Sequence, residues 1–495
     1  MDHPLAAAGS GAATRKENTL ILQQSPTMCL PDQAVRALEQ HLSGSVIRPD
    51  DAAYDQTRQV WNRAVNRYPA LIVQPAHAQD VRHAIAFARQ HNLPIAVRSG
   101  GHSPAGYGTV NDGLVIDLNR MKHVDVDVTN RTATAESGLT WGEFNQATYG
   151  AGLATPGPDV AAVGLGGHTL GGGFGWLSRK HGLTVDNLLA AELVTADGAV
   201  ITASGTENPD LFWALRGGGG NFGVVTSLQF TLHPLGDVTG GVLVYPATRD
   251  ILRAYADAGV NAPNELTTLA SVTLAPPLPF IPERHRGTPV LMMIACYDGD
   301  PAMSDGAFVA FRQLGGAQLI ADTIGPVPYL ALFDMTARGA THQPQAIRAG
   351  FMDEFSDDAI DAILDAIAHA SSPTSAVMLR ALGGAIARAP MDATAFSHRD
   401  KPLYFAVNNS WEATPGVAGD IHVAWTEALW AKLAPHTAGA YANFLAGEGP
   451  ARVQAAYSPA HYARLVEIKR QYDPGNIFHL NANIPPAPTR HTSVR

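Results

Sequence analysis

The glycines of this chain are most concentrated in three short stretches, and this clustering limits the fold more than any other feature. The chain has 48 glycines, with dense groups at residues 100–106, 164–175 and 217–223. Six of them stand between positions 164 and 173, where we expect neither a helix nor a strand because glycine weakens both. Glycine lets the backbone come close to a ligand. We therefore expect a large ligand held by backbone from several sides.

The first glycine stretch directly follows residues 94–97, whose apolar character predicts a short buried strand. Glycines there allow a positive φ, and successive N–H groups form a concavity that suits a pyrophosphate. Arg98 adds positive charge beside it, and His102 projects an imidazole toward the ligand. Taken alone, the segment is equally consistent with a tight turn that contains an incidental histidine.

Motifs for other ligands and reactions are weak or missing. The glycine pattern is a poor match to an NAD site, since its loops do not each lie in a strand–loop–helix unit with an acidic residue about twenty positions on. No Walker lysine and no GxSxG hydrolase motif is present. His168 and His181 lack the HxH or HxxxH spacing of a zinc site, so we predict no metal and expect His168 to hydrogen-bond within its loop.

The overall charge limits the partners. The 34 basic and 44 acidic residues give a net charge of −10, which argues against nucleic acid and anionic membranes. The two cysteines, Cys29 and Cys296, exclude a disulfide framework, and no apolar run is long enough to span a bilayer. Together with a poor signal-peptide candidate at the N-terminus, these features favour a cytoplasmic protein with a flexible tail at residues 1–26.

The middle third of the chain has a different pattern. Strands are expected at residues 266–274, 290–297, 376–386 and 403–411, and helices at 356–370 and 421–433. This alternation predicts an antiparallel sheet covered on one face by helices, which would suit a lid over a flat ligand. A last helix, residues 460–472, ends before Pro474 and is followed by an asparagine-rich segment.

The loop at residues 98–103, the glycine stretches at 164–175 and 219–225, and the segment 473–484 together resemble the berberine-bridge-type FAD-linked oxidases of the vanillyl-alcohol oxidase/p-cresol methylhydroxylase superfamily. The resemblance implies an α+β fold, with a two-lobed FAD-binding domain and an antiparallel-sheet substrate domain. The expected boundaries are 27–239 for the FAD-binding domain (core 67–237), 240–436 for the substrate domain, and 437–495 for a segment that completes the first domain.

In such proteins FAD is bonded to the histidine that matches His102, and a second bond can come from a cysteine where this chain has Val160. The resemblance thus implies one covalent link, as in the bacterial group that includes 6-hydroxy-D-nicotine oxidase. Val163 matches the position that lines the oxygen side of the flavin. The cofactor-binding residues implied are Arg98, Ser99, Gly100, Gly101, His102, Ser103, Gly106, Tyr107, Val163, Gly164, Gly166, Gly167, His168, Gly171, Gly172, Gly173, Gly175, Asn187, Gly220, Gly223, Val225, Asn481 and Asn483.

The resemblance also implies an oxidase that takes a hydride from a CH–OH or CH–NH carbon of a small molecule and passes electrons to O₂, as a monomer or homodimer. A flavin-dependent oxidative cyclase or monooxygenase of secondary metabolism, or a flavoprotein that has lost turnover, are the alternatives. The family's two common active-site tyrosines are replaced by Phe174 and Phe444. We expect Tyr404, Tyr441 and Asn408 to supply the catalytic polar groups, unless the substrate is an amine that needs no base. Period-2 alternation places Tyr404 and Asn408 on one strand face.

Overall fold

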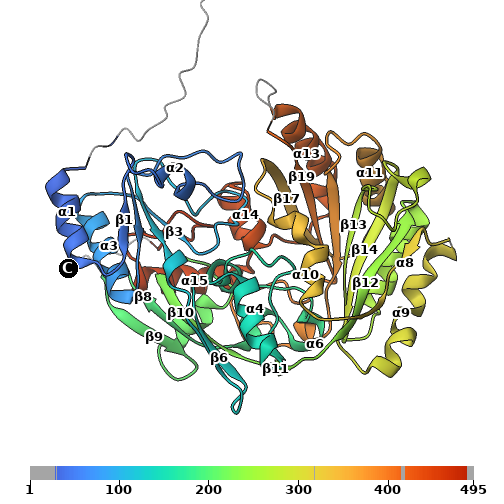
Figure 1. Cartoon of the computed structure of the whole chain (residues 1–495), viewed down its shortest axis with the longest axis horizontal. Helices are drawn as coiled ribbons and strands as arrows, with labels where there is room; N and C mark the ends of the chain where they lie inside the picture. The colour runs from blue at the N-terminus through green and yellow to red at the C-terminus, as the bar shows by residue number, and fades with distance from the viewer. Residues whose placement is uncertain (1–27, 29, 317, 414–418, 488–495) are drawn as a thin grey trace, which may run out of the picture.

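The computed structural model describes residues 28, 30–316, 318–413 and 419–487, so the expected tail at residues 1–26 lies outside it. Figure 1 shows two halves side by side: one carries the N-terminal elements in blue to green, and the other is built around one large sheet. The fold is α+β, as the sequence predicted. Within the described ranges, no helix combines the length and the apolar character that crossing a membrane requires.

The first small sheet has the strand order β1-β2-β4-β3, and β4 is parallel to both of its neighbours. Helix α3 packs Val81, Ala84 and Ile85 into the core under these strands. β3 ends at Arg98, so the His102 loop leaves from the carboxyl end of a parallel strand, the edge at which α/β sheets bind ligands. The elements are β1 (Ser45–Ile47), β2 (Leu71–Gln74), β3 (Ile95–Arg98), β4 (Leu114–Asp117), α1 (Asp32–His41), α2 (Tyr54–Thr57) and α3 (Ala78–Gln90).

The second sheet is antiparallel, in the order β5-β6-β10-β8-β9. Its core joins Trp141 of α4 to Phe230 of β10 and to Leu465 of α15, near the end of the chain. The C-terminal segment therefore completes the core of the first half. The elements are β5 (Val124–Asp127), β6 (Thr132–Glu136), β8 (Leu188–Val194), β9 (Val200–Ser204), β10 (Val224–Thr231), the pair β7 (Leu153–Ala154) and β11 (His233–Pro234), α4 (Trp141–Gly150), α5 (Leu165–Leu170), α6 (Ser178–His181), α7 (Pro209–Leu215), α14 (Pro450–Gln454) and α15 (Pro459–Tyr472).

One expectation for the second glycine stretch is wrong, because α5 forms inside it. The close approach of the backbone at Gly164 to the backbone at Gly100 explains why a glycine is needed where this helix begins. A Cβ placed on Gly164, at the start of α5, would lie 2.0 Å from the backbone nitrogen of Gly100. Leu165 and Leu170 are buried in the core of the second sheet, and this packing outweighs the poor helix propensity of glycine.

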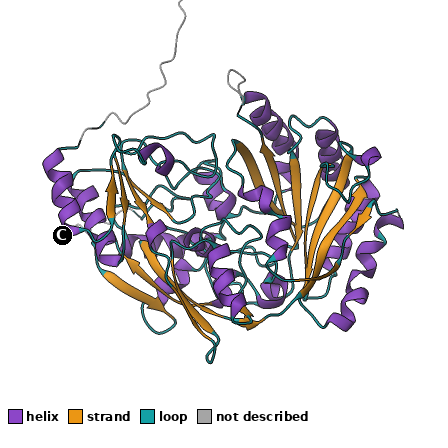
Figure 2. Cartoon of the chain, in the orientation of Figure 1, coloured by secondary structure: helices purple, strands orange, loops and turns teal. Residues whose placement is uncertain are grey.

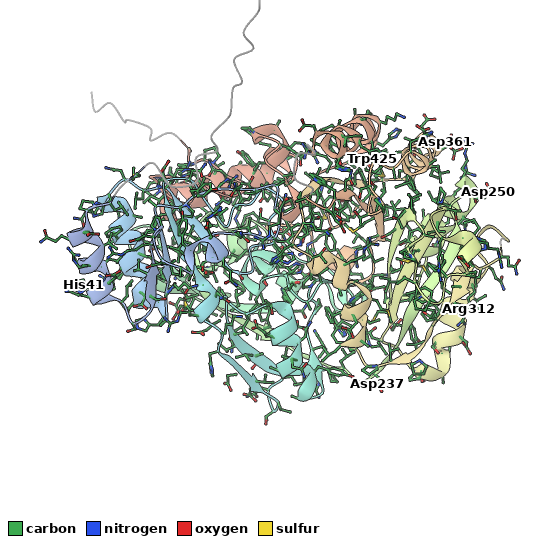
Figure 3. All side chains as sticks on the ribbon, turned by 45° about the horizontal axis from the view of Figure 1, so that its top comes forward. His41, Asp237, Asp250, Arg312, Asp361 and Trp425 are labelled. Atoms are coloured by element: carbon green, nitrogen blue, oxygen red, sulfur yellow. The ribbon has the colours of Figure 1, made fainter. Side chains whose placement is uncertain are left out.

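The large sheet is antiparallel, and its main path runs β15-β12-β14-β13-β18-β19-β17, with β16 added against β12. Helices lie along its outer side (Figure 2), and Figure 3 places Asp250, Arg312 and Asp361 of the outer helices far from His41 of α1. The elements are β12 (Val238–Pro246), β13 (Leu266–Leu274), β14 (Pro289–Tyr297), β15 (Ala321–Asp322), β16 (Gly325–Val327), β17 (Gln345–Met352), β18 (Ala376–Ala381), β19 (Leu403–Ser410), α8 (Arg249–Val260), α9 (Ser304–Arg312), α10 (Ala331–Met335), α11 (Asp357–Ala368), α12 (Ala385–Arg388) and α13 (Asp420–Leu433).

The strand expected at residues 376–386 is shorter than predicted. β18 ends at Ala381, and α12 follows at Ala385. Gly384 has a φ of +58°, a left-handed conformation that interrupts a strand and that glycine adopts readily.

The two faces of the large sheet differ in what covers them. On β19, Leu403, Phe405 and Val407 pack in the cluster that contains α8, α11 and α13. Tyr404 and Ala406 alternate with them and pack in a different cluster, with Phe174 of the first half. The helices thus cover one face, as predicted, and the other face is turned toward the glycine loops.

Candidate functional site

His102 lies on the loop after β3, in a position that leaves one ring nitrogen free. Its ring stacks on Trp61 with 4.8 Å between centroids, and its Nε2 is buried without a hydrogen-bond partner. Burial lowers the pKa of His102 to about 4. The imidazole is therefore neutral near pH 7, the protonation state that a nucleophile requires.

Arg98 does not have the role expected from sequence. Its Nε and Nη2 bond to the two carboxylate oxygens of Asp117 at 3.2 and 2.9 Å, and its Nη1 donates to the carbonyl of Gln59. The pair is buried, so Asp117 already neutralises the charge that was expected beside a phosphate. Arg98 instead ties β3 to β4 at the base of the His102 loop.

Both polar atoms of the Asn187 side chain are also hydrogen-bonded to other groups of the protein. Its Nδ2 donates to the carbonyls of His181 and Leu183, and its Oδ1 is 2.7 Å from Nε2 of His233. Its side chain holds a turn together and has little capacity left for a ligand.

The predicted glycines fall into two groups. Several are packed against protein atoms, where a Cβ would collide with a neighbour: Gly100, Gly164, Gly106, Gly171, Gly172, Gly173, Gly175 and Gly223. Gly166 is less tightly packed, and its N–H donates to Ser99 Oγ at 3.3 Å. Gly167 and Gly220 have open space instead, with no atom within 4 Å of a Cβ. Gly101 has a φ of +67°, which lets the chain turn sharply before His102.

The C-terminal asparagines come to the third glycine stretch. Asn481 Nδ2 donates to the carbonyl of Gly220 at 3.0 Å. The Oδ1 atoms of Asn481 and Asn483 are buried without partners. Since buried polar atoms are nearly always hydrogen-bonded, these oxygens indicate a ligand at the open side of Gly220.

The remaining predicted cofactor residues are placed by ordinary packing. Ser103 accepts a backbone bond from Gly106, Tyr107 is half-buried beside them, and Val225 is buried in β10. Val163 is half-buried, and its carbonyl accepts from Trp141 N at 2.9 Å.

His168 is held by contacts with two other segments of the chain. Its Nε2 is 3.4 Å from Thr184 Oγ1, and its ring meets Trp141 edge-on. Burial lowers the pKa of His168 to about 3. No group of three or more histidine, cysteine or acidic side chains that could hold a metal ion occurs among the residues that the structure describes.

Tyr404 and Asn408 share the face of β19 that is turned toward the first half. The hydroxyl of Tyr404 and the Oδ1 of Asn408 are both buried without a hydrogen-bond partner. Tyr404 packs edge-on against Phe174 at 5.1 Å and near Tyr441 at 5.8 Å. The strand alternation expected from sequence thus brings two free polar atoms to one surface.

Tyr441 is engaged by two donors. Its hydroxyl oxygen accepts from the N–H of Gly173 at 3.1 Å and from Asn443 Nδ2 at 2.9 Å, and its ring stacks on Phe174 at 4.6 Å. Burial raises the pKa of Tyr441 and of Tyr404, although Arg380 lowers both in part. Both phenols therefore remain protonated at neutral pH.

An ion pair that sequence reasoning missed lies beside these aromatic rings. Arg380 on β18 stands opposite Tyr404 in the sheet register, and its Nη2 bonds to Asp159 Oδ2. Its guanidinium carbon lies 5.6 Å from the Phe174 ring centre and 5.8 Å from that of Trp176. A charged residue in an otherwise apolar strand is a signal that could have flagged Arg380. No local pattern marks its partner, because Asp159 lies 221 residues earlier.

A cavity of about 760 Å³ lies elsewhere, between α6, α8 and α9, and none of the predicted residues line it.

Comparisons with known proteins identify relatives of this chain in sequence and in fold. Residues 69–204 match the family described as "FAD binding domain", and residues 440–485 match "Berberine and berberine like". An FAD-linked oxidoreductase of Dictyostelium discoideum is 32% identical over 477 residues, which cover 94% of this chain and 99% of the relative. The (R)-6-hydroxynicotine oxidase of Paenarthrobacter nicotinovorans is 30% identical over 457 residues, covering 90% and 97%. The crystal structure of 6-hydroxy-D-nicotine oxidase from Arthrobacter nicotinovorans superposes with a TM-score of 0.80 at 28% identity, covering 90% and 98%.

Proposed function

Because this chain belongs to the berberine-bridge-like FAD-linked oxidoreductases, we propose that it oxidises a CH–OH or CH–NH carbon of a small organic molecule with O₂ as the final acceptor. The observation that carries this proposal is the free Tyr404 hydroxyl and the free Asn408 oxygen on the sheet face turned toward the glycine loops. These atoms could hold a substrate polar group at that face.

The residues present fit the FAD that this family binds. Two segments far apart in the sequence offer three buried polar atoms without partners, at His102 Nε2, Asn481 Oδ1 and Asn483 Oδ1. Gly167 and Gly220 leave open space next to their backbones. FAD held by these groups would supply the hydride acceptor.

We also propose that His102 alone carries the cofactor covalently. Its neutral, unpartnered Nε2 supports this role. Val160 has no sulfur to form a second bond, and its side chain faces Gly339, where a Cβ would lie 2.7 Å from Val160 Cγ2. Precipitation of the wild-type protein with acid should leave the pellet yellow, and the His102→Ala variant should release its flavin. A colourless wild-type pellet would contradict the covalent link.

The oxidase reaction is tested with the purified holoenzyme. Alcohols, sugars, aryl amines and N-heterocycles are screened for hydrogen peroxide production, and the reduced enzyme is mixed with air-saturated buffer in a stopped-flow instrument. We expect rapid reoxidation, for which the half-buried Val163 leaves the oxygen side open. A reduced flavin that persists for minutes would instead indicate a dehydrogenase with another acceptor.

A further inference from the structure

The ion pair between Asp159 and Arg380 is only half formed. Arginine and carboxylate groups commonly pair through two parallel N–H···O bonds, but here only Nη2 and Oδ2 are joined. The other two atoms, Arg380 Nη1 and Asp159 Oδ1, are both buried without a hydrogen-bond partner. Leaving such atoms unpaired is costly, so this open end of the pair indicates a ligand.

The pair faces the same surface as the polar atoms of β19. Arg380 is directly opposite Tyr404 in the register of β18 and β19, so both side chains leave the same face of the sheet. The Arg380 side chain is only 3% exposed and the Asp159 side chain 16%. The backbone carbonyl of Asp159 accepts from Thr336 Oγ1, which fixes the loop that carries it.

Resting on the proposed oxidase function, we propose that Asp159 and Arg380 bind the reacting hydroxyl of the substrate, with Asp159 as the base, and that the substrate is a neutral alcohol and not an amine. A hydroxyl group completes both bonds, since it can donate to Asp159 Oδ1 and accept from Arg380 Nη1. A protonated amine cannot accept a hydrogen bond, and it meets the like charge of Arg380.

The step balances with the proposed cofactor. The O–H bond breaks and its proton goes to Asp159 Oδ1, while the C–H hydrogen leaves with its electron pair for oxidised FAD. The carbon–oxygen bond becomes a carbonyl. Arg380 Nη1 stabilises the negative charge that grows on the oxygen as the proton leaves.

The ionisation of the pair is compatible with this role. Burial raises the pKa of Asp159 to about 6, with Arg380 acting against the rise, so the carboxylate is mostly ionised at pH 7 and can accept a proton. The other titratable groups close to the pair are Tyr404, Tyr441, Tyr255, Tyr329, His168 and Cys296. Burial keeps each of them neutral near pH 7.

The first experiment compares alcohols with their amine counterparts on the wild-type holoenzyme. The pairs are 1-phenylethanol and 1-phenylethylamine, cyclohexanol and cyclohexylamine, and glucose and glucosamine, together with the N-heterocyclic amine nicotine. Anaerobic flavin reduction should be at least about tenfold faster for an alcohol than for its amine. Faster reduction by amines would overturn the assignment to alcohols but keep the oxidase function, whereas no reduction by any compound would count against both.

The second experiment tests the base with two matched variants. Asp159→Asn removes the free carboxylate oxygen, and Asp186→Asn makes the same change in the buried pair of Asp186 with Arg399. In that pair both carboxylate oxygens are already bonded to the arginine, and the side chains are 17% and 0% exposed. Flavin content and thermal unfolding midpoint are measured for both, and should fall by similar amounts.

Only Asp159→Asn should slow alcohol-dependent reduction, on the order of 10²-fold. The reduction rate of the wild type should rise as the pH increases through about 6, and the Asp159→Asn variant should not show this rise. Calorimetry provides a measurement apart from turnover. The ligands are 1-methylcyclohexanol and 2-phenylpropan-2-ol, tertiary alcohols with no hydrogen on the carbon that bears the hydroxyl. Arg380→Met should weaken by about tenfold the binding of the one that the wild type binds more tightly. Equal rates in the two aspartate variants, a wild-type rate that is flat through pH 6, or unchanged alcohol binding in Arg380→Met would each contradict the proposal.

Discussion

The two tyrosines of the candidate site differ in the hydrogen bonds that their hydroxyl groups make, and this difference predicts that their loss affects stability to different extents. Tyr441 accepts two hydrogen bonds, one from the backbone N–H of Gly173, whereas Tyr404 has no partner. Tyr441→Phe leaves a buried donor unpaired and should lower the free energy of unfolding by about 1–3 kcal/mol. Tyr404→Phe, the matched control, should change it by less than about 0.5 kcal/mol. Equal losses in urea unfolding would contradict this account.

The same two variants separate substrate binding from proton transfer. If Tyr404 only donates a hydrogen bond to the substrate, Tyr404→Phe should slow anaerobic flavin reduction by about fivefold, because one neutral hydrogen bond is worth about 1 kcal/mol. If Tyr404→Phe or Tyr441→Phe lowers the rate of flavin reduction by on the order of 10²-fold or more, that tyrosine is the catalytic base and Asp159 is not.

Sequence patterns located some of these side chains and missed others for identifiable reasons. Strand alternation was enough to place Tyr404 and Asn408 on one face, because that relation is local. Arg98 pairs with Asp117 on the neighbouring strand, and Arg380 pairs with Asp159, which is 221 residues away in the sequence. The first contact follows from strand register and the second from a loop packing against the sheet, and a single sequence specifies neither.

Helices and strands were predicted correctly where a hydrophobic pattern repeats over many residues, and incorrectly where glycines interrupt the pattern. The helix at Asp357–Ala368 begins after the Ser356 cap, close to its expected start. The helix α5 could not be predicted from propensity, because it contains Gly166 and Gly167 and forms where Leu165 and Leu170 are buried in the core.

Helix α15 is attached to the first half through a fully buried network. Lys469 Nζ donates to Asp473 Oδ2 and to the carbonyls of Asn221 and Phe478, at 2.7, 2.7 and 2.9 Å. Lys469→Ala leaves Asp473 buried without its cation, so it should lower the free energy of unfolding by about 3–5 kcal/mol. The neighbouring exposed Arg470 pairs with Glu467, and Arg470→Ala should cost less than about 1 kcal/mol. Similar costs for both variants would show that the network is not what holds the helix.

For the chain as a whole, buried histidines predict a loss of stability in mild acid. Burial lowers the pKa of His233 to about 4, from an ordinary value of about 6.5. Between these values the unfolded chain binds more protons, so this contribution is complete above pH 6.5 and is lost as the pH falls toward 4. With allowance for partial exposure, we expect His233→Gln to reduce the loss of unfolding free energy between pH 7 and pH 5 by about 1 kcal/mol. As a control, the exposed His123→Gln variant should behave as wild type in urea unfolding at the two pH values. If His233→Gln loses as much unfolding free energy between pH 7 and pH 5 as the wild type does, His233 is not the cause.

The contact between Asn481 and the carbonyl of Gly220 also fixes an order of events during synthesis. The ribosome must add 261 residues after Gly220 before Asn481 exists, and the large sheet is made in that interval. A nascent chain that has emerged only through Gly220 therefore still lacks the two unpartnered asparagine oxygens of the proposed cofactor site. If these asparagines hold the cofactor as proposed, its capture must wait until the polypeptide is nearly finished, together with completion of the core that the same C-terminal segment closes.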